Sequence, residues 1–127
     1  MEDRTYRIGI LEDDIVLPAS LLVGFHADPL AAMRADGHEC PDDAYAGSFT
    51  YDQDAEDDGA IYFPHDPSLT VIVHEAAHAI IGIFHRRGLP VPTRDSDADD
   101  EEVFVHTLGL LVQEIVNALH DEEAADE

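Results

Sequence analysis

The chain has 127 residues, of which 29 are acidic and six are basic, so its formal net charge at pH 7 is −23. Such a surface repels nucleic acid, and without a basic cluster we do not expect DNA or RNA binding. The length and the 45% hydrophobic content predict a single domain with its own core. We place this domain at residues 1–120 and expect residues 121–127 to be an acidic, disordered tail.

The charge pattern also predicts the environment. All six basic residues are arginine, and the acidic residues gather at 52–58, at 95–102 and in the tail, which indicates solvated loops. Lysine-free, aspartate-rich surfaces are typical of halophilic archaea and their viruses, because molar salt shortens the Debye length to about 3 Å. We therefore expect a protein of a high-salt cytoplasm, with assembly into a virion as an alternative. Nucleic-acid mimicry is a weaker alternative, because carboxylates pooled in loops do not follow phosphate spacing.

The N-terminal half reads as short strands around one helix. Turn signals and alternation predict strands at 6–11, 15–17, 48–51 and 60–63, whereas 20–25 is ambiguous between a strand and a helix start. Asp28, Pro29 and Gly37 predict a short helix between them. Strand 60–63 directly precedes the next helix, and it is either an ordinary strand of the sheet or, as the alternative, a sheet edge that pairs with an extended peptide.

An HExxH motif, residues 74–78, lies in the next segment. Ser68 suits the N-cap of a helix, and Gly88 suits the position after its end. His74 and His78 are four residues apart on this helix, so both imidazoles can converge on one metal ion. Glu75 between them is placed to take a proton from a metal-bound water. His85 shares the same face but lies about 10 Å further along the helix axis, too far for the same metal.

A second helix is predicted from about residue 98 to residue 120. Its polar residues form one stripe, made of Glu102, His106, Gln113 and Asn117 with Gly109 among them. A catalytic zinc needs a third protein ligand, and Glu102 is the leading candidate, with Glu101 as the alternative. Gly109 would let the two helices approach closely behind the metal. His74, Glu75 and His78 interrupt the longest apolar run, so we expect no membrane-spanning segment.

The motif and the second helix together resemble a known family. His74-Glu75-Ala76-Ala77-His78, followed 24 residues after His78 by Glu102-Val-Phe-Val-His-Thr-Leu-Gly109, resembles the gluzincin arrangement of zinc metallopeptidases. It is more narrowly similar to short HExxH proteins of tailed viruses. The resemblance covers about residues 60–119. It implies an α+β zincin-like core in which a short, mainly antiparallel sheet packs against the HExxH helix and a C-terminal helix.

The resemblance also implies a site. His74, His78 and Glu102 would bind Zn²⁺, and Glu75 would be the general base. His106 stands where the related pattern has an aromatic residue. It could stabilise an oxyanion as a catalytic residue, close the site as a fourth ligand, or pair with Glu102.

Two functions follow from this interpretation. The first is a zinc-dependent metallopeptidase that hydrolyses peptide bonds of a peptide or protein substrate with metal-activated water. The alternative is a non-catalytic virion or host-interaction protein that keeps the zincin scaffold with a structural or vestigial metal and binds a viral or host protein. The two differ in their need for the carboxyl group of Glu75.

Overall fold

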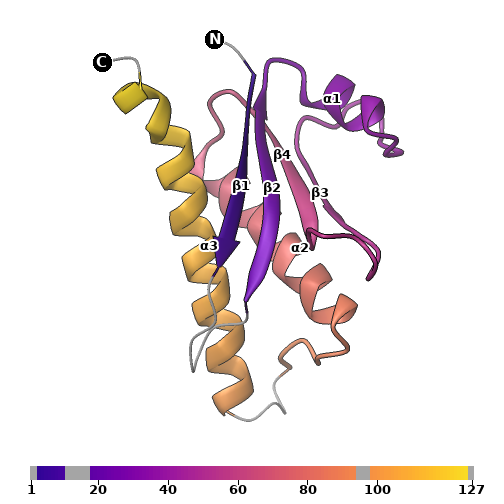
Figure 1. Cartoon of the computed structure of the whole chain (residues 1–127), viewed down its shortest axis with the longest axis vertical. Helices are drawn as coiled ribbons and strands as arrows, with labels where there is room; N and C mark the ends of the chain where they lie inside the picture. Colours follow the sequence, from indigo (N-terminus) through magenta and orange to yellow (C-terminus); the bar gives the residue numbers. More distant parts are fainter. Residues whose placement is uncertain (1–2, 11–17, 94–97, 126–127) are drawn as a thin grey trace.

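The computed structural model describes residues 3–10, 18–93 and 98–125 of the chain. The predicted strand 15–17 and the acidic residues 95–97 lie outside this description. The fold is α+β: a four-stranded mixed sheet with three helices packed against it (Figure 1). The elements in chain order are β1 (Arg4–Ile10), β2 (Ala19–His26), α1 (Pro29–Ala35), β3 (Gly47–Thr50), β4 (Gly59–Pro64), α2 (Leu69–Arg86) and α3 (Ala98–Ala125).

The strands lie in the order β1-β2-β4-β3. β1 pairs with β2 and β3 pairs with β4 in antiparallel fashion, whereas β2 and β4 are parallel, from Leu21 opposite Gly59 to His26 opposite Pro64. Strand 60–63 is therefore an ordinary strand of the sheet, and the alternative of an edge position is wrong. β4 lies inside the sheet, and its residues from Gly59 to Phe63 are all buried, because both of its faces are covered. The strand at this edge of the sheet is β3.

Each face of the sheet carries its own apolar layer. Helices α2 and α3 cover one face, where Val23, Phe25 and Phe63 of the sheet meet Ile80 and Leu111. Helix α1 covers part of the other face, where Met33 packs against Ala60 and Tyr62. Figure 1 shows the two longer helices on one side of the strands and α1 on the other. This alternation follows from the period of two along a strand.

The predicted starts and ends of α1 and α2 are confirmed. Asp28 caps α1 by accepting a hydrogen bond from the backbone N–H of Ala31, and Ser68 caps α2 by accepting one from Val71 at 3.2 Å. Gly37 and Gly88 follow the two helices with positive φ angles of 90° and 69°. Glycine adopts this left-handed conformation at little cost, so both helices end where the sequence indicates.

Helix α3 is longer than predicted. It continues to Ala125, so residues 121–125 of the predicted tail are helical. Its stretch Asp99–Asp121 has a mean hydropathy of 1.3 and is long enough to cross a membrane, contrary to the expectation that no segment reaches that length. Length and composition alone are weak evidence for a membrane span, since core helices of water-soluble domains pass the same test. Here α3 packs on α2 and β1 through Leu111 and Ile115, which are fully buried, but only 17% of the apolar stretch is buried inside the fold.

Candidate functional site

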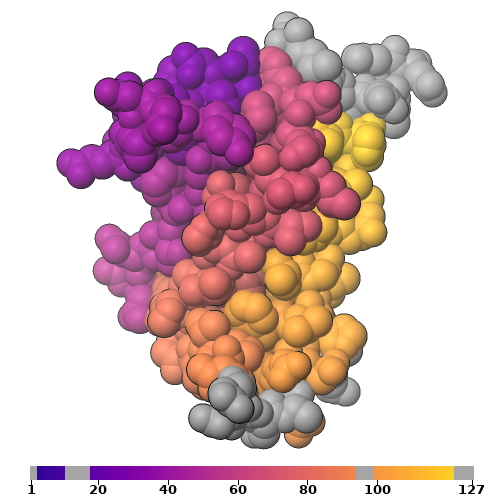
Figure 2. All heavy atoms as spheres, turned by 180° about the vertical axis from the view of Figure 1, so that it is seen from behind, coloured from indigo at the N-terminus to yellow at the C-terminus, as the bar shows by residue number. Residues whose placement is uncertain are grey.

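The two histidines of the motif lie together on the outer face of α2. Their rings are 4.7 Å apart between centroids and inclined by 75°, and both residues are exposed. The opposite face of α2, with Ile72, Ile80 and Ile83, is buried against the sheet and α3. In Figure 2, which shows the molecule from behind, α2 crosses the middle of the visible face with α3 beside it. The two rings thus lie close together on one face, as predicted for residues four apart on a helix.

Glu75 differs from its two neighbours because it is buried, with 8% of its surface exposed. On the helix it lies between the apolar face and the histidine face, on the side of α2 that meets β3. Burial raises the pKa of its carboxyl group, and His74 and His78 partly offset this effect. A carboxyl group with a raised pKa exchanges protons closer to neutral pH, which suits general acid–base chemistry.

A surface hollow of about 380 Å³ joins these residues to the loop before β3. His74, Glu75, Thr70 and Val71 form the α2 side, and residues 43–46 form the other side. Tyr45 is the most prominent of them, with 62% of its surface exposed. The hollow therefore brings an exposed imidazole, a buried carboxyl group and a phenol ring to the start of the edge strand.

The predicted third ligand lies elsewhere. Glu102 pairs with His106 on its own helix at 2.9 Å, and the two side chains are 61% and 47% exposed. Glu102 lies about 180° around α3 from Leu111, which is at the centre of the packed face. Glu101, the predicted alternative, is also exposed. The polar stripe of α3 therefore faces solvent rather than the histidines of α2.

The packing of α3 explains this outcome. Phe104 contacts Phe84 of α2 at 5.1 Å between ring centroids, and Thr107 is fully buried beside it. This contact turns Gly109 outward, where a Cβ atom would have no neighbour within 4 Å. The predicted close approach at Gly109 is wrong. The close approach occurs at Gly82 of α2, where a Cβ atom would lie 1.8 Å from the Thr50 hydroxyl of β3.

These positions decide how far the side chains suit a catalytic zinc ion. The two imidazoles fit as nitrogen donors, because their spacing and exposure leave both rings open to a shared metal. Within the described ranges, no group of three histidine, cysteine, aspartate or glutamate side chains has the geometry to hold a metal. The side chains thus fit two of the three predicted ligands and do not fit the complete set.

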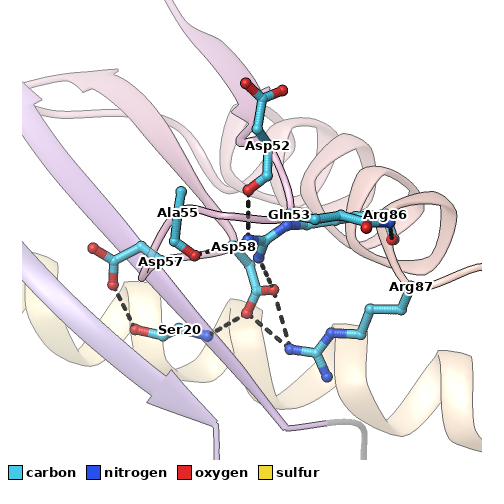
Figure 3. A network of polar contacts seen from close by, with 8 residues as sticks. All are labelled: Ser20, Asp52, Gln53, Ala55, Asp57, Asp58, Arg86 and Arg87. Atoms are coloured by element: carbon cyan, nitrogen blue, oxygen red, sulfur yellow. Dashed lines mark hydrogen bonds and ion pairs between the residues drawn. The ribbon is translucent and has the colours of Figure 1, made fainter.

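Two buried aspartates were missed by sequence reasoning. Asp57 and Asp58 lie in the 52–58 segment that was predicted as a solvated loop, yet they are only 6% and 5% exposed. Asp58 accepts hydrogen bonds from Arg86, from Arg87 at 2.9 Å and from the backbone N–H of Ser20 at 2.9 Å (Figure 3). The network joins the β3–β4 loop to the end of α2 and the start of β2. No local motif signals it, because its members come from distant parts of the chain.

A second missed cluster centres on Asp3. Its carboxylate lies 3.1 Å from Nδ1 of His26 and 3.0 Å from Nε2 of His65, and it accepts the backbone N–H of Ala27 at 2.9 Å. These contacts hold the pKa of Asp3 below its usual value, with the Ala27 hydrogen bond as the largest cause. Asp3, His26 and His65 are far apart in the sequence, so no local motif signals this cluster.

Comparison of the chain with protein-family models, with curated proteins and with solved structures finds no match. The resemblance to gluzincins therefore rests on the residues of the HExxH motif and on Glu102. Of these, His74 and Glu75 line one hollow, the His78 ring lies beside that of His74, and Glu102 pairs with His106 on α3.

Proposed function

We propose that the chain is a zinc-dependent, metallopeptidase-like hydrolase in which His74 and His78 bind the metal and Glu75 is the general base. The proposal rests on two neighbouring, exposed imidazoles beside a buried carboxyl group, with His74 and Glu75 lining one hollow. Zinc in such a site supplies a Lewis acid and lowers the pKa of a coordinated water. Glu75 supplies proton transfer, for which its raised pKa is suited.

The neighbouring edge strand favours a peptide as the substrate. β3 pairs only with β4 among the described strands, so its other edge has no strand partner among them. An extended peptide can bind such an edge through main-chain hydrogen bonds. The loop that leads into β3 also lines the hollow with His74 and Glu75. A peptide along β3 would therefore pass the side chains that carry the proposed chemistry.

Glu102 and His106 keep their predicted roles only as hypotheses. Of the three roles predicted for His106, pairing with Glu102 is the one that corresponds to the observed contact. For Glu102 to become a ligand, α3 would have to present its opposite face to α2. The zinc content of Glu102→Ala tests whether Glu102 binds the metal.

The decisive experiment measures zinc per chain by elemental mass spectrometry after purification in high salt. We expect close to one zinc per wild-type chain and a loss in His78→Ala. Glu102→Ala tests the third ligand, with Glu101→Ala as the matched control. Glu75→Gln should retain the metal and lose peptide hydrolysis. Wild-type protein without zinc, after zinc was supplied during folding, would refute the proposal.

The outward position of Glu102 favours a second candidate function. A protein that keeps a zincin-like scaffold for contact with a viral or host protein has no need of a complete catalytic site. In that case Glu75→Gln would leave every measurable property of the folded protein unchanged except its stability. Hydrolysis by the wild type that is lost in Glu75→Gln would exclude this second function.

A further inference from the structure

A small polar hollow lies on the α1 side of the sheet, opposite the face covered by α2. It has a volume of about 80 Å³, and its polar lining is Thr5, His26, Asp36, Tyr51 and Tyr62. The strand register explains why it exists. Gly24 of β2 lies between Thr5 of β1 and Tyr62 of β4, and it contributes no side chain to that row. The sheet surface is therefore lowered at Gly24.

The imidazole of His26 covers part of this low point. A Cβ atom on Gly24 would lie 2.2 Å from Nε2 of His26, so the ring can take this position only over glycine. Nδ1 of the same ring contacts the Asp3 carboxylate at 3.1 Å. A carboxylate can only accept, so in the neutral ring Nδ1 carries the proton and Nε2 is a hydrogen-bond acceptor. Asp3 thus fixes which nitrogen is offered at the hollow.

The other side of the hollow carries a carboxylate and two phenols. Tyr62 donates a hydrogen bond from its hydroxyl to Asp36 at 2.5 Å, and its ring stacks on His26 with centroids 5.7 Å apart. Burial and then Asp36 raise the pKa of Tyr62, and burial followed by Asp36 raises that of Tyr51. Both phenols therefore stay protonated at neutral pH, and the charged group of the hollow is Asp36.

We propose that this hollow binds a primary ammonium group. Such a group has three N–H donors, and the hollow offers three kinds of acceptor: the Asp36 carboxylate, Nε2 of His26 and the Thr5 hydroxyl. With a volume of about 80 Å³, the hollow has room for a group the size of methylammonium. The net charge of −23 favours cations over anions, and the chain has no lysine of its own.

The test is an NMR titration of the labelled full-length protein with methylammonium chloride, which replaces KCl at constant ionic strength. We expect saturable shifts of the His26 and Tyr62 ring signals. Asp36→Asn should weaken binding about tenfold or more, since it removes a charge-assisted hydrogen bond. Nα-acetyl-lysine methylamide forms a second arm. Saturation with both probes indicates a lysine side chain as the natural ligand, and saturation with methylammonium alone indicates a free amine.

Two further variants control the experiment. Gly24→Ala should abolish the response, because a methyl group there displaces the His26 ring. Asp42→Asn should leave it unchanged, because Asp42 is exposed and pairs with Arg34 away from the hollow. If Gly24→Ala fails to fold, the binding measured for Asp36→Asn is sufficient to test the proposal. We expect Asp36→Asn to fold, because Asp36 is exposed. Shifts that rise linearly with concentration, shifts of equal size with tetramethylammonium, or wild-type binding by Asp36→Asn would each overturn the proposal.

Discussion

At the scale of single residues, arginine is used in two different ways. Arg34 forms an exposed pair with Asp42, in which the side chains are 47% and 99% exposed. Arg86 and Asp58, in contrast, are 10% and 7% exposed in their side chains, and Arg87 joins them. Asp58 therefore holds two guanidinium groups in a region that water reaches poorly. Removal of one partner from a buried pair leaves an uncompensated charge, which costs more than the loss of an exposed pair.

This difference yields a matched pair of variants. We expect Asp58→Asn to lower the free energy of unfolding by about 3 kcal/mol, the usual size of the effect for a broken buried ion pair. Asp42→Asn removes the same charge from an exposed pair and should cost less than about 1 kcal/mol. Urea denaturation of both variants in the same salt measures the two values. Equal costs for the two would show that the buried ion pairs of Asp58 contribute no more to stability than the exposed pair.

At the scale of elements, the two long helices show how far a sequence pattern extends. The 3.6-residue period predicted correctly that His74 and His78 share a face, because this depends on α2 alone. The orientation of α3 was predicted wrongly. Apolar residues cover most of its circumference, and Val105 and Leu110 are in fact exposed, so hydrophobicity does not select the packed face. The contact between Phe84 and Phe104 selects it, and such a contact is not visible in a single sequence.

The glycines of these helices test the observed orientation. Gly109→Ala should raise the free energy of unfolding by about 0.5–1 kcal/mol, because alanine favours a helix and the site has open space. Gly82→Ala should lower it, because its Cβ would collide with the Thr50 hydroxyl. In a Thr50→Ala background the same change should become neutral or stabilising. Thermal unfolding of the wild type, the three single variants and the Thr50→Ala/Gly82→Ala double variant measures these signs, and a destabilising Gly109→Ala would place that residue in a close contact.

At the scale of the whole molecule, the secondary-structure elements were easier to predict from the sequence than the pairing of the strands. The α+β class, both long helices and most strands were expected from local signals. The parallel pairing of β2 with β4 was not, because it depends on which strands meet after the chain has passed through α1 and β3. The buried Asp57 and Asp58 were missed for a similar reason, since their arginine partners lie on β1 and α2.

The charge of the whole molecule predicts its response to salt. A net charge of −23 opposes the compact state through self-repulsion, and added salt screens it. We expect the unfolding temperature to rise by at least about 5 °C between 0.01 and 1 M NaCl, as the Debye length falls from about 30 Å to about 3 Å. Most of the rise should occur below about 0.5 M. A melting temperature that is flat over this lower range, measured by circular dichroism, would show that self-repulsion is unimportant for stability.

The mixed strand order also has a consequence for folding kinetics. β1 and β2 follow each other in the chain and pair antiparallel, so their contacts are local, as are those within α2. The parallel pairing of β2 with β4 closes a loop that contains α1 and β3, and such a closure carries a larger entropic cost. We therefore expect this central pairing to form late and to limit the rate of refolding. The edge strand β3 joins the sheet by pairing with β4. The proposed peptide-binding edge would therefore be among the last surfaces to form during folding.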